Sequence, residues 1–266
     1  MVSSIALVAV AGVSFQTWSP DSAAMARVDE GARAAARSSL ASSRPRSFGH
    51  LYSINEGLSF RQATAPASIG RNENRGFIYG GGAHGRWNVH GGLTLGLTVE
   101  ATGNRFDTDR VEFLMLKTRA DLGLTFHPAN TATVAPYVSF GYHRWIRDLE
   151  SVRQLVGQTQ TWRRHYGQVG VEAAHLPSRA LRAYVNAAVI APLASRMKID
   201  DLGRTCRVNF DGSPSAAGEI GVMYKRLLVS VFYEGQRFPQ SRDRCFGAAQ
   251  PESRADMFGL KTGFGF

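Results

Sequence analysis

The chain has 266 residues, of which 44% are hydrophobic and 20% charged, and its formal net charge is +10. This length is typical of a single domain. No apolar run approaches the roughly 20 residues that a membrane-spanning helix needs, so helical spans are excluded. The basic excess favours polyanionic partners, such as nucleic acid or lipid phosphates, and charge alone does not choose between them.

Residues 1–26 have the pattern of a candidate signal peptide, with a short apolar run followed by Ala24-Met25-Ala26 as a cleavage site. No Lys or Arg precedes the run, so either the true start lies upstream or the signal is atypical. Residues 27–49 are rich in Ala, Ser and Arg. We expect a periplasmic lead-in there, helical or disordered, and a single β-domain over residues 50–266.

From about residue 50 the sequence alternates apolar and polar positions with period two, which is typical of strands. In the clearest case, Leu95, Leu97 and Val99 alternate with Thr98 and Glu100. Ten strands are expected, near 51–62, 75–87, 93–102, 114–126, 134–147, 168–174, 184–191, 219–224, 229–234 and 256–266. Glu56 falls on the apolar face of the first, which predicts a bulge or a shifted register there.

The connections between these strands alternate between long and short. Residues 148–160, 199–214 and 239–253 are long connections, whereas 176–181 and 225–227 are short. Long outer loops and short periplasmic turns are the asymmetry of membrane barrels. The sequence therefore predicts an all-β fold, a transmembrane antiparallel up-and-down β-barrel of ten strands. Eight strands is the alternative, because 51–62 and 75–87 are poorly patterned.

The last eleven residues alternate large side chains or Thr with Gly or Lys, and the chain stops at Phe266. Such a closing strand resembles that of the small bacterial outer-membrane β-barrel proteins. The resemblance implies location in the bacterial outer membrane and contact with its lipid and lipopolysaccharide. It also implies that the barrel-assembly machinery reads Phe264 and Phe266. The oligomeric state stays open.

If the apolar face meets lipid, charged side chains must point into the barrel. Acids and bases on neighbouring strands should then pair, because isolated buried charges are costly. The lumen network is expected to contain Glu100, Lys117, Arg119, Asp121, Glu172, Glu219, Glu234 and Lys261. A structural network that fills the lumen and the wall of a narrow pore are both compatible with this pattern.

Aromatic residues near strand ends suggest two interfacial belts. The short-turn belt would contain Trp87, Phe126, Tyr137 and Phe266, and the long-loop belt Phe106, Tyr142, Trp145, Trp162, Tyr166 and Phe238. The run Gly80-Gly81-Gly82 is interpreted as a strand kink rather than a phosphate loop, since no Lys-Ser or Lys-Thr follows it.

The two cysteines, Cys206 and Cys245, fall in neighbouring long loops. In an oxidising compartment we expect a disulfide between them. No His or Cys has metal-ligand spacing nearby, so neither a metal nor a cofactor is predicted.

An enzyme is the main functional alternative. The ten-stranded architecture resembles the omptin proteases, and Asp107 and Asp109 have the spacing of one of their acidic pairs. The partner Asp-x-His is missing, with Asp200-Asp201 in its place, so the mechanism lacks a general base. His143 and His165, expected close together near the outer rim, are weak candidates for a lipid-modifying site.

The favoured interpretation is therefore a non-enzymatic barrel with a structural or surface-interaction role. The alternatives are an omptin-like protease or lipid-modifying enzyme, and a narrow pore for small solutes. Arginines of the loops are either candidates for holding lipopolysaccharide phosphates or, more simply, solvated loop charges, namely Arg71, Arg75, Arg147, Arg153, Arg163, Arg164, Arg242 and Arg244. No nucleic-acid-binding motif is present.

Overall fold

The computed structural model describes residues 48–62, 72–106, 111–149, 158–178, 180–201, 203–245 and 248–266. The candidate signal peptide at 1–26, the lead-in up to residue 47, and Asp107 and Asp109 lie outside the described residues. The first strand begins at Phe48, just before the expected start of the barrel at residue 50. No helix of the described segments is long and apolar enough to cross a membrane.

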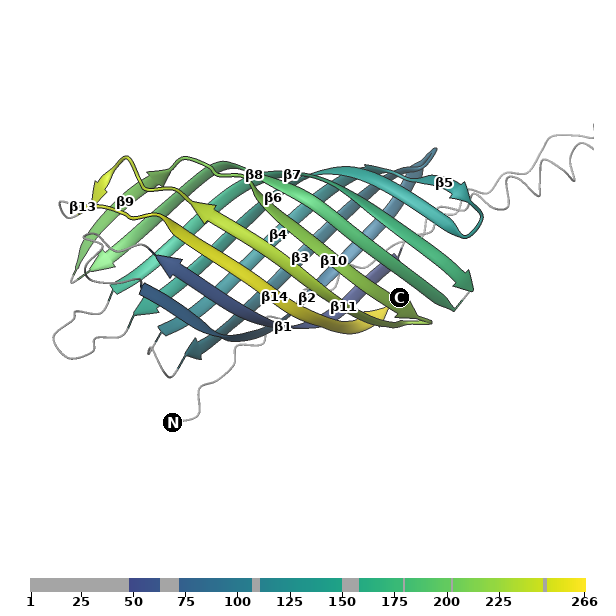
Figure 1. Ribbon diagram of the computed structural model, residues 1–266, viewed down its shortest axis with the longest axis horizontal. Helices are drawn as coiled ribbons and strands as arrows, with labels where there is room; N and C mark the ends of the chain where they lie inside the picture. The colour runs from purple at the N-terminus through teal and green to yellow at the C-terminus, as the bar shows by residue number, and fades with distance from the viewer. Residues whose placement is uncertain are drawn as a thin grey trace, which may run out of the picture. The chain divides into compact units, whose positions relative to one another are not determined.

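Ten strands form the wall of a barrel (Figure 1). They are β1 (Phe48–Gln62), β2 (Asn72–His90), β3 (Leu93–Phe106), β4 (Val111–Leu124), β6 (Ala132–Leu149), β7 (Gln158–Ser178), β8 (Leu181–Asp201), β10 (Ser215–Tyr224), β11 (Leu227–Phe238) and β14 (Ser253–Gly265). Four short strands complete the sheets: β5 (Phe126–Ala129), β9 (Arg204–Phe210), β12 (Arg244–Cys245) and β13 (Ala248–Ala249).

Each wall strand pairs antiparallel with its sequence neighbours, and β14 closes the sheet against β1. Closure leaves no free edge, so the backbone N–H and C=O groups pair within the wall, as a bilayer requires. The start of β1 meets the end of the chain at the short-turn end of the barrel. There Gly49 and Phe266 exchange two backbone hydrogen bonds of 3.1 and 2.9 Å. The predicted all-β barrel of ten strands is confirmed, and the eight-stranded alternative is wrong.

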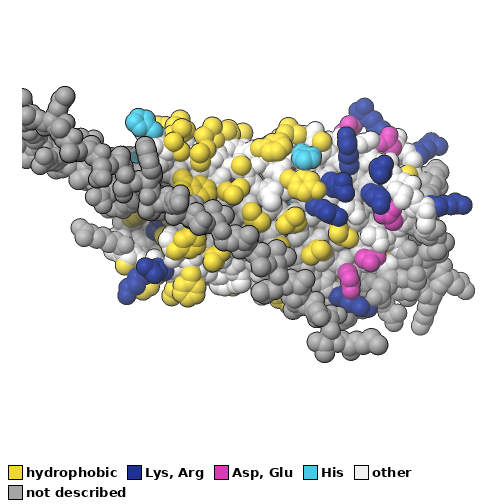
Figure 2. Space-filling model, turned by 180° about the vertical axis from the view of Figure 1, so that it is seen from behind, with side chains coloured by type: hydrophobic (Ala, Val, Ile, Leu, Met, Phe, Trp, Pro, Cys, Tyr) yellow, Lys and Arg dark blue, Asp and Glu magenta, His cyan; other side chains and the backbone are white. Residues whose placement is uncertain are grey.

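The outer face of the wall is an apolar band. On the regular strands the predicted phase holds: Leu97 and Val169 are exposed, whereas Thr98 and Gln168 are buried. Exposed apolar side chains occur on all ten wall strands, for example Leu51, Phe77, Leu95, Leu116, Phe140, Val171, Val189, Ile220, Val231 and Phe258. Figure 2 shows them as a broad yellow surface, with basic side chains gathered beyond it at one end.

The strands extend well past the band on the side of the long connections. β7 and β8 have 21 residues each, about twice the 9–11 that a tilted strand needs to span a bilayer. The expected loop at 199–214 is largely a β-hairpin, in which β9 pairs with Ser195–Asp201 of β8. Gly203 turns this hairpin with a φ of 77°, a conformation that favours glycine.

β1 departs from the predicted phase. Its pairing with both β2 and β14 runs without a register shift, so the bulge expected at Glu56 is wrong. Instead the whole even-numbered face of β1 points inward: Ile54 and Leu58 are buried beside Glu56, while Leu51 is exposed. The apolar face of this strand is therefore a lumen face, and Glu56 is one of its members.

The glycine run in β2 provides space for the lumen. Pairing with β1 continues without a register shift through Gly80, Gly81 and Gly82. A Cβ atom on Gly82 would lie 2.8 Å from the ring of Tyr52 and 2.9 Å from Cγ of Glu100. The glycine thus lets two large lumen side chains approach the wall.

Val169→Arg tests the assignment of the outer face. Val169 is 65% exposed in the middle of the band. An arginine there should lower the free energy of unfolding by about 2–4 kcal/mol in a bilayer. Thr159→Arg is the matched control on the same face of β7, beyond the band, where Asp148 accepts a hydrogen bond from Thr159. Denaturant titration in lipid vesicles measures both, and equal effects would contradict the assignment.

Candidate functional site

The lumen holds a continuous network of charged side chains in its middle. Lys261 Nζ lies 2.9 Å from Glu100 Oε1 and 3.2 Å from Glu219 Oε2. Lys117 contacts Glu234 and lies 3.6 Å from Glu100. The two lysines therefore share Glu100, and strands of the wall are joined through them.

Tyrosines complete this central network. The Tyr52 hydroxyl donates to Glu100 at 2.8 Å, and the Tyr184 hydroxyl donates to Glu219 at 2.6 Å. Glu56, further along β1, accepts from Thr102 Oγ1 at 3.0 Å. Each carboxylate thus has a donor, which is the condition for burying charge without a large desolvation cost.

A second group of ion pairs lies toward the short-turn end. Glu172 Oε1 receives both Arg86 and Arg182 at 2.8 Å. Arg119 pairs with Asp121 on its own strand, with Nε 2.8 Å from Oδ1. All eight side chains named in the sequence as the lumen network point inward, and each has an ion-pair partner.

Sequence reasoning missed several participants in the network, namely Tyr52, Glu56, Arg86, Arg182 and Tyr184. Three of them lie on β1 and β2, whose alternation was too irregular to assign faces. Arg182 stands just before the expected strand at 184–191. A usable signal was present at Arg86. Like Gly80 and Gly82 it has an even number, so alternation places it on the same face of the strand as those two glycines.

A cavity of about 120 Å³ lies within this charged region. Its lining runs from Lys117 and Glu234 to Phe48 and Arg182 near the short-turn end. A space of this size holds a few water molecules, and the mixed charges of its wall would hydrogen-bond to them.

Toward the long connections the lumen is filled by an aromatic cluster, here called the plug. Its rings come from strands all around the wall: Phe60, Trp145, Trp162, Phe210 and Phe238. The ring centres of Trp162 and Phe238 are 4.7 Å apart, and those of Trp145 and Phe60 are 5.6 Å apart. Such pairs add about 0.5–1.5 kcal/mol each beyond their area burial.

Two arginines lie against the plug. The guanidinium carbon of Arg147 is 4.8 Å from the centre of the Phe60 ring, and that of Arg164 is 5.8 Å from the Phe238 ring. Both side chains are about 1% exposed. The expectation that Arg75, Arg147, Arg163 and Arg164 belong to outer loops is wrong, because all four lie on strands and two of them, Arg147 and Arg164, are buried. Arg71 and Arg153 lie outside the described residues.

The plug also corrects the predicted long-loop belt. Phe106, Trp145, Trp162, Tyr166 and Phe238 are each at most 5% exposed, because the strands that carry them turn these positions inward. Tyr142 alone of this group faces outward. In the short-turn group, Tyr137 also points inward, where its hydroxyl donates to Asn186 at 2.8 Å.

The two histidine candidates lie on opposite faces of the wall. His143 points inward, stacks on Trp145 with ring centres 5.9 Å apart, and places Nδ1 2.7 Å from Gln236 Nε2. His165 points outward and packs against Tyr142 at 5.0 Å. The expectation that these histidines lie close enough to share a site is wrong, because adjacent register positions alternate between faces.

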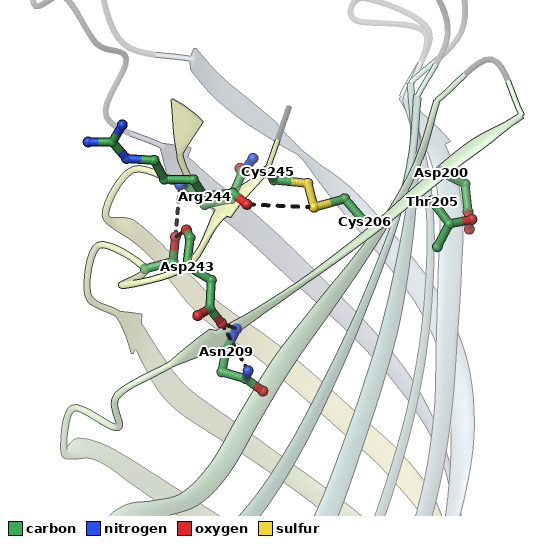
Figure 3. Close-up of a disulfide and its surroundings, with 9 residues drawn as sticks. Asp200, Thr205, Cys206, Asn209, Asp243, Arg244 and Cys245 are labelled. Carbon is green, nitrogen blue, oxygen red and sulfur yellow. Dashed lines mark hydrogen bonds between the residues drawn. A yellow bond between two sulfur atoms is a disulfide. The ribbon is translucent and has the colours of Figure 1, made fainter. Parts of the chain in front are cut away.

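A disulfide links Cys206 on β9 to Cys245 on β12, so it joins the β8–β9 hairpin to the connection that follows β11 (Figure 3). Their Cα atoms are 5.8 Å apart, and Cys245 is buried in the plug cluster. Asp243 Oδ2 accepts from the backbone N and the side-chain Nδ2 of Asn209, at 2.8 and 2.9 Å. These hydrogen bonds lower the pKa of Asp243.

Asp200, near the tip of the β8–β9 hairpin, has two polar partners. Asp200 Oδ2 lies 2.8 Å from Lys198 Nζ, and Oδ1 accepts from Thr205 Oγ1 at 2.6 Å (Figure 3). These two bonds lower the pKa of Asp200. The carboxylate is thus engaged in holding the hairpin.

Comparisons with known proteins give structural likeness alone. No protein-family model matches the chain, and no curated protein matches it significantly. The translocator domain of the autotransporter NalP from Neisseria meningitidis is 9% identical, with a TM-score of 0.41 and coverage of 87% of this chain and 94% of that one. A major outer membrane protein from Thermus thermophilus is 15% identical, with a TM-score of 0.40 and coverage of 82% and 99%. The Neisserial surface protein A is 7% identical, with a TM-score of 0.35 and coverage of 81% and 96%.

The barrel's own geometry defines its class. A closed wall of ten antiparallel strands, an apolar outer band and charges turned inward describe a transmembrane β-barrel. The protein is therefore a transmembrane β-barrel whose wall has ten strands.

Lys261→Met tests the central network. The change removes one cation from Glu100 and the ion-pair partner of Glu219, so the free energy of unfolding should fall by about 3–5 kcal/mol. The double variant Lys261→Met/Glu219→Gln should recover part of that loss, since the amide can be buried without a counter-charge. Denaturant titration of the refolded barrel measures both variants, and absence of recovery would argue against the pairing.

Proposed function

We propose that the protein is a non-conducting outer-membrane barrel with a structural or surface-interaction role, whose long connections face outward. The observation that carries this proposal is the plug. It fills the lumen between the charged network and the outer connections with buried aromatic rings from five strands. A hydrated path for solutes would have to displace these rings.

The fastened outer end supports the same role. The disulfide, the Asp243–Asn209 hydrogen bonds and the β8–β9 hairpin give a defined shape to the described parts of two connections, those that follow β8 and β11. A defined outer surface suits presentation to a partner, because little ordering entropy remains to be lost on binding. The proposal also includes export by the N-terminal signal and assembly through Phe264 and Phe266, which are both exposed at the end of the chain.

The pore alternative is tested by conductance in planar bilayers. The wild-type barrel should give no steady current, since the plug seals the lumen. Trp145→Ala/Trp162→Ala removes two central rings and should raise conductance above the wild type. Phe140→Ala/Tyr142→Ala, on the outer face of β6, is the matched control and should not. A steady wild-type current would overturn the proposal, as would a folded plug variant that stays closed.

The enzyme alternative is tested by Asp107→Asn/Asp109→Asn. The sequence names these two acids as the omptin-like pair, so protease and lipase assays should give the same result for the variant as for the wild type. A wild-type hydrolytic activity that the double variant loses would establish the enzyme in place of the proposed role.

A further inference from the structure

The outer wall carries a row of three arginines on adjacent strands. Arg144 on β6 pairs in register with Arg163 on β7, and Arg163 pairs with Arg196 on β8. All three lie at outward-facing positions, and Arg163 and Arg196 are exposed. Side chains directly opposite on neighbouring strands have Cβ atoms about 4.5–5.5 Å apart. The three arginine side chains therefore start from adjacent positions on the outer wall.

This arginine row lacks a counter-charge within the described part of the chain. No described carboxylate lies within ion-pair distance of Arg144, Arg163 or Arg196. Asp200, an acid on the same outer face of β8, is engaged by Lys198 at 2.8 Å. Like charges directly opposite across a sheet are destabilising. The row is thus a local cost to the folded barrel unless an anion from outside the chain relieves it.

A second row of arginines on the outer wall shows the contrast. Arg254 on β14 lies directly opposite both Arg237 on β11 and Arg61 on β1, and Arg237 and Arg254 are exposed. There Arg254 Nε lies 2.7 Å from Asp256 Oδ2, and the Tyr233 hydroxyl donates to the same carboxylate. The central arginine of that second row is therefore paired with a carboxylate of the chain, Asp256, whereas no described carboxylate pairs with Arg144, Arg163 or Arg196.

The position of the arginine row relative to the band identifies the anion. One outward position closer to the short turns, Tyr142 and His165 pack together, and the exposed Phe140 follows. Amphipathic rings at the border of an apolar band mark the membrane interface. The next outward position, two residues further along a strand tilted by about 40°, lies roughly 5 Å higher along the barrel axis. That height corresponds to the headgroup layer on the long-connection side. On the face that Figure 2 shows, basic side chains gather at one end, beyond the yellow surface.

We propose that Arg144, Arg163 and Arg196 form a binding site for the phosphate groups of lipopolysaccharide in the outer leaflet. Guanidinium groups bind phosphate oxygens bidentately, and a row of three matches a headgroup with more than one phosphate. The apolar side chains below the row would contact the acyl chains of the same lipid. The site rests on the outward orientation of the long connections in the proposed function and is independent of whether the lumen is sealed.

The variant Arg163→Gln/Arg196→Gln tests the site against Arg237→Gln/Arg254→Gln as a matched control. Both remove two exposed arginines that face each other across adjacent strands. Native mass spectrometry with purified phosphorylated lipopolysaccharide measures binding. The test variant should lose about tenfold or more in affinity, as expected for charge-assisted hydrogen bonds, and the control should stay within about twofold.

The source of the phosphate is distinguished by the probe. Dephosphorylated lipopolysaccharide should bind the wild type and the test variant equally, and inorganic phosphate at the same phosphate concentration should not compete. Competition by free phosphate, equal wild-type affinity for the two lipids, or equal losses in test and control variants would each overturn the proposal.

A stability measurement separates binding from a structural role. Without lipopolysaccharide the test variant should unfold at the same denaturant concentration as the wild type or a higher one, because a repulsion is removed. With lipopolysaccharide the wild type should be the more stable, because a ligand that binds the folded state stabilises it. A variant destabilised equally in both conditions contradicts the proposal. If the glutamine variant does not fold, Arg163→Lys/Arg196→Lys keeps the charge and should show reduced but phosphate-dependent binding, whereas unchanged binding overturns the site.

Discussion

The hydrogen-bonded closure of β14 against β1 is the constraint on which the rest of the structure depends. In a bilayer every backbone N–H and C=O must be paired within the chain, and the closed sheet achieves this. Closure also sets the cross-strand register, from Leu51 opposite Phe264 to Gln62 opposite Ser253. Because side chains alternate with period two, the register then decides which residue of each strand meets lipid and which enters the lumen.

The side chains that point into the lumen form two layers with different chemistry. In the middle and toward the short turns, lysines and arginines are matched to carboxylates, as Lys261 is to Glu100 and Glu219. Toward the long connections, the buried rings of Trp145, Trp162 and their neighbours form the plug. The first layer joins strands through paired charge and the second through apolar burial. A ten-stranded barrel is too narrow for a wide channel, and these two layers are the basis of the proposed sealed role.

The regular strands show how far alternation predicts structure. On β3 and β4 the phase assigned Glu100, Lys117, Arg119 and Asp121 to the lumen, where the structure places them. The predicted phase failed on β1, where Ile54 and Leu58 point inward although the apolar face was expected outside. A period-two pattern shows that a strand has two faces; it does not state which face is covered by lipid and which by the plug.

The amino-acid sequence was enough to determine the barrel class, its even strand number and the pairing of two cysteines at one end. The signals were the alternation of apolar and polar residues, the alternation of long and short connections, and the terminal aromatic residue. Those features are local or depend only on order along the chain. The tertiary structure alone decided that Trp145 and Trp162 fill the lumen, that His143 and His165 face opposite ways, and that Arg144, Arg163 and Arg196 share a row. The physical reason is that neighbours across a sheet are set by the register of the closed wall, which no single strand carries in its own sequence.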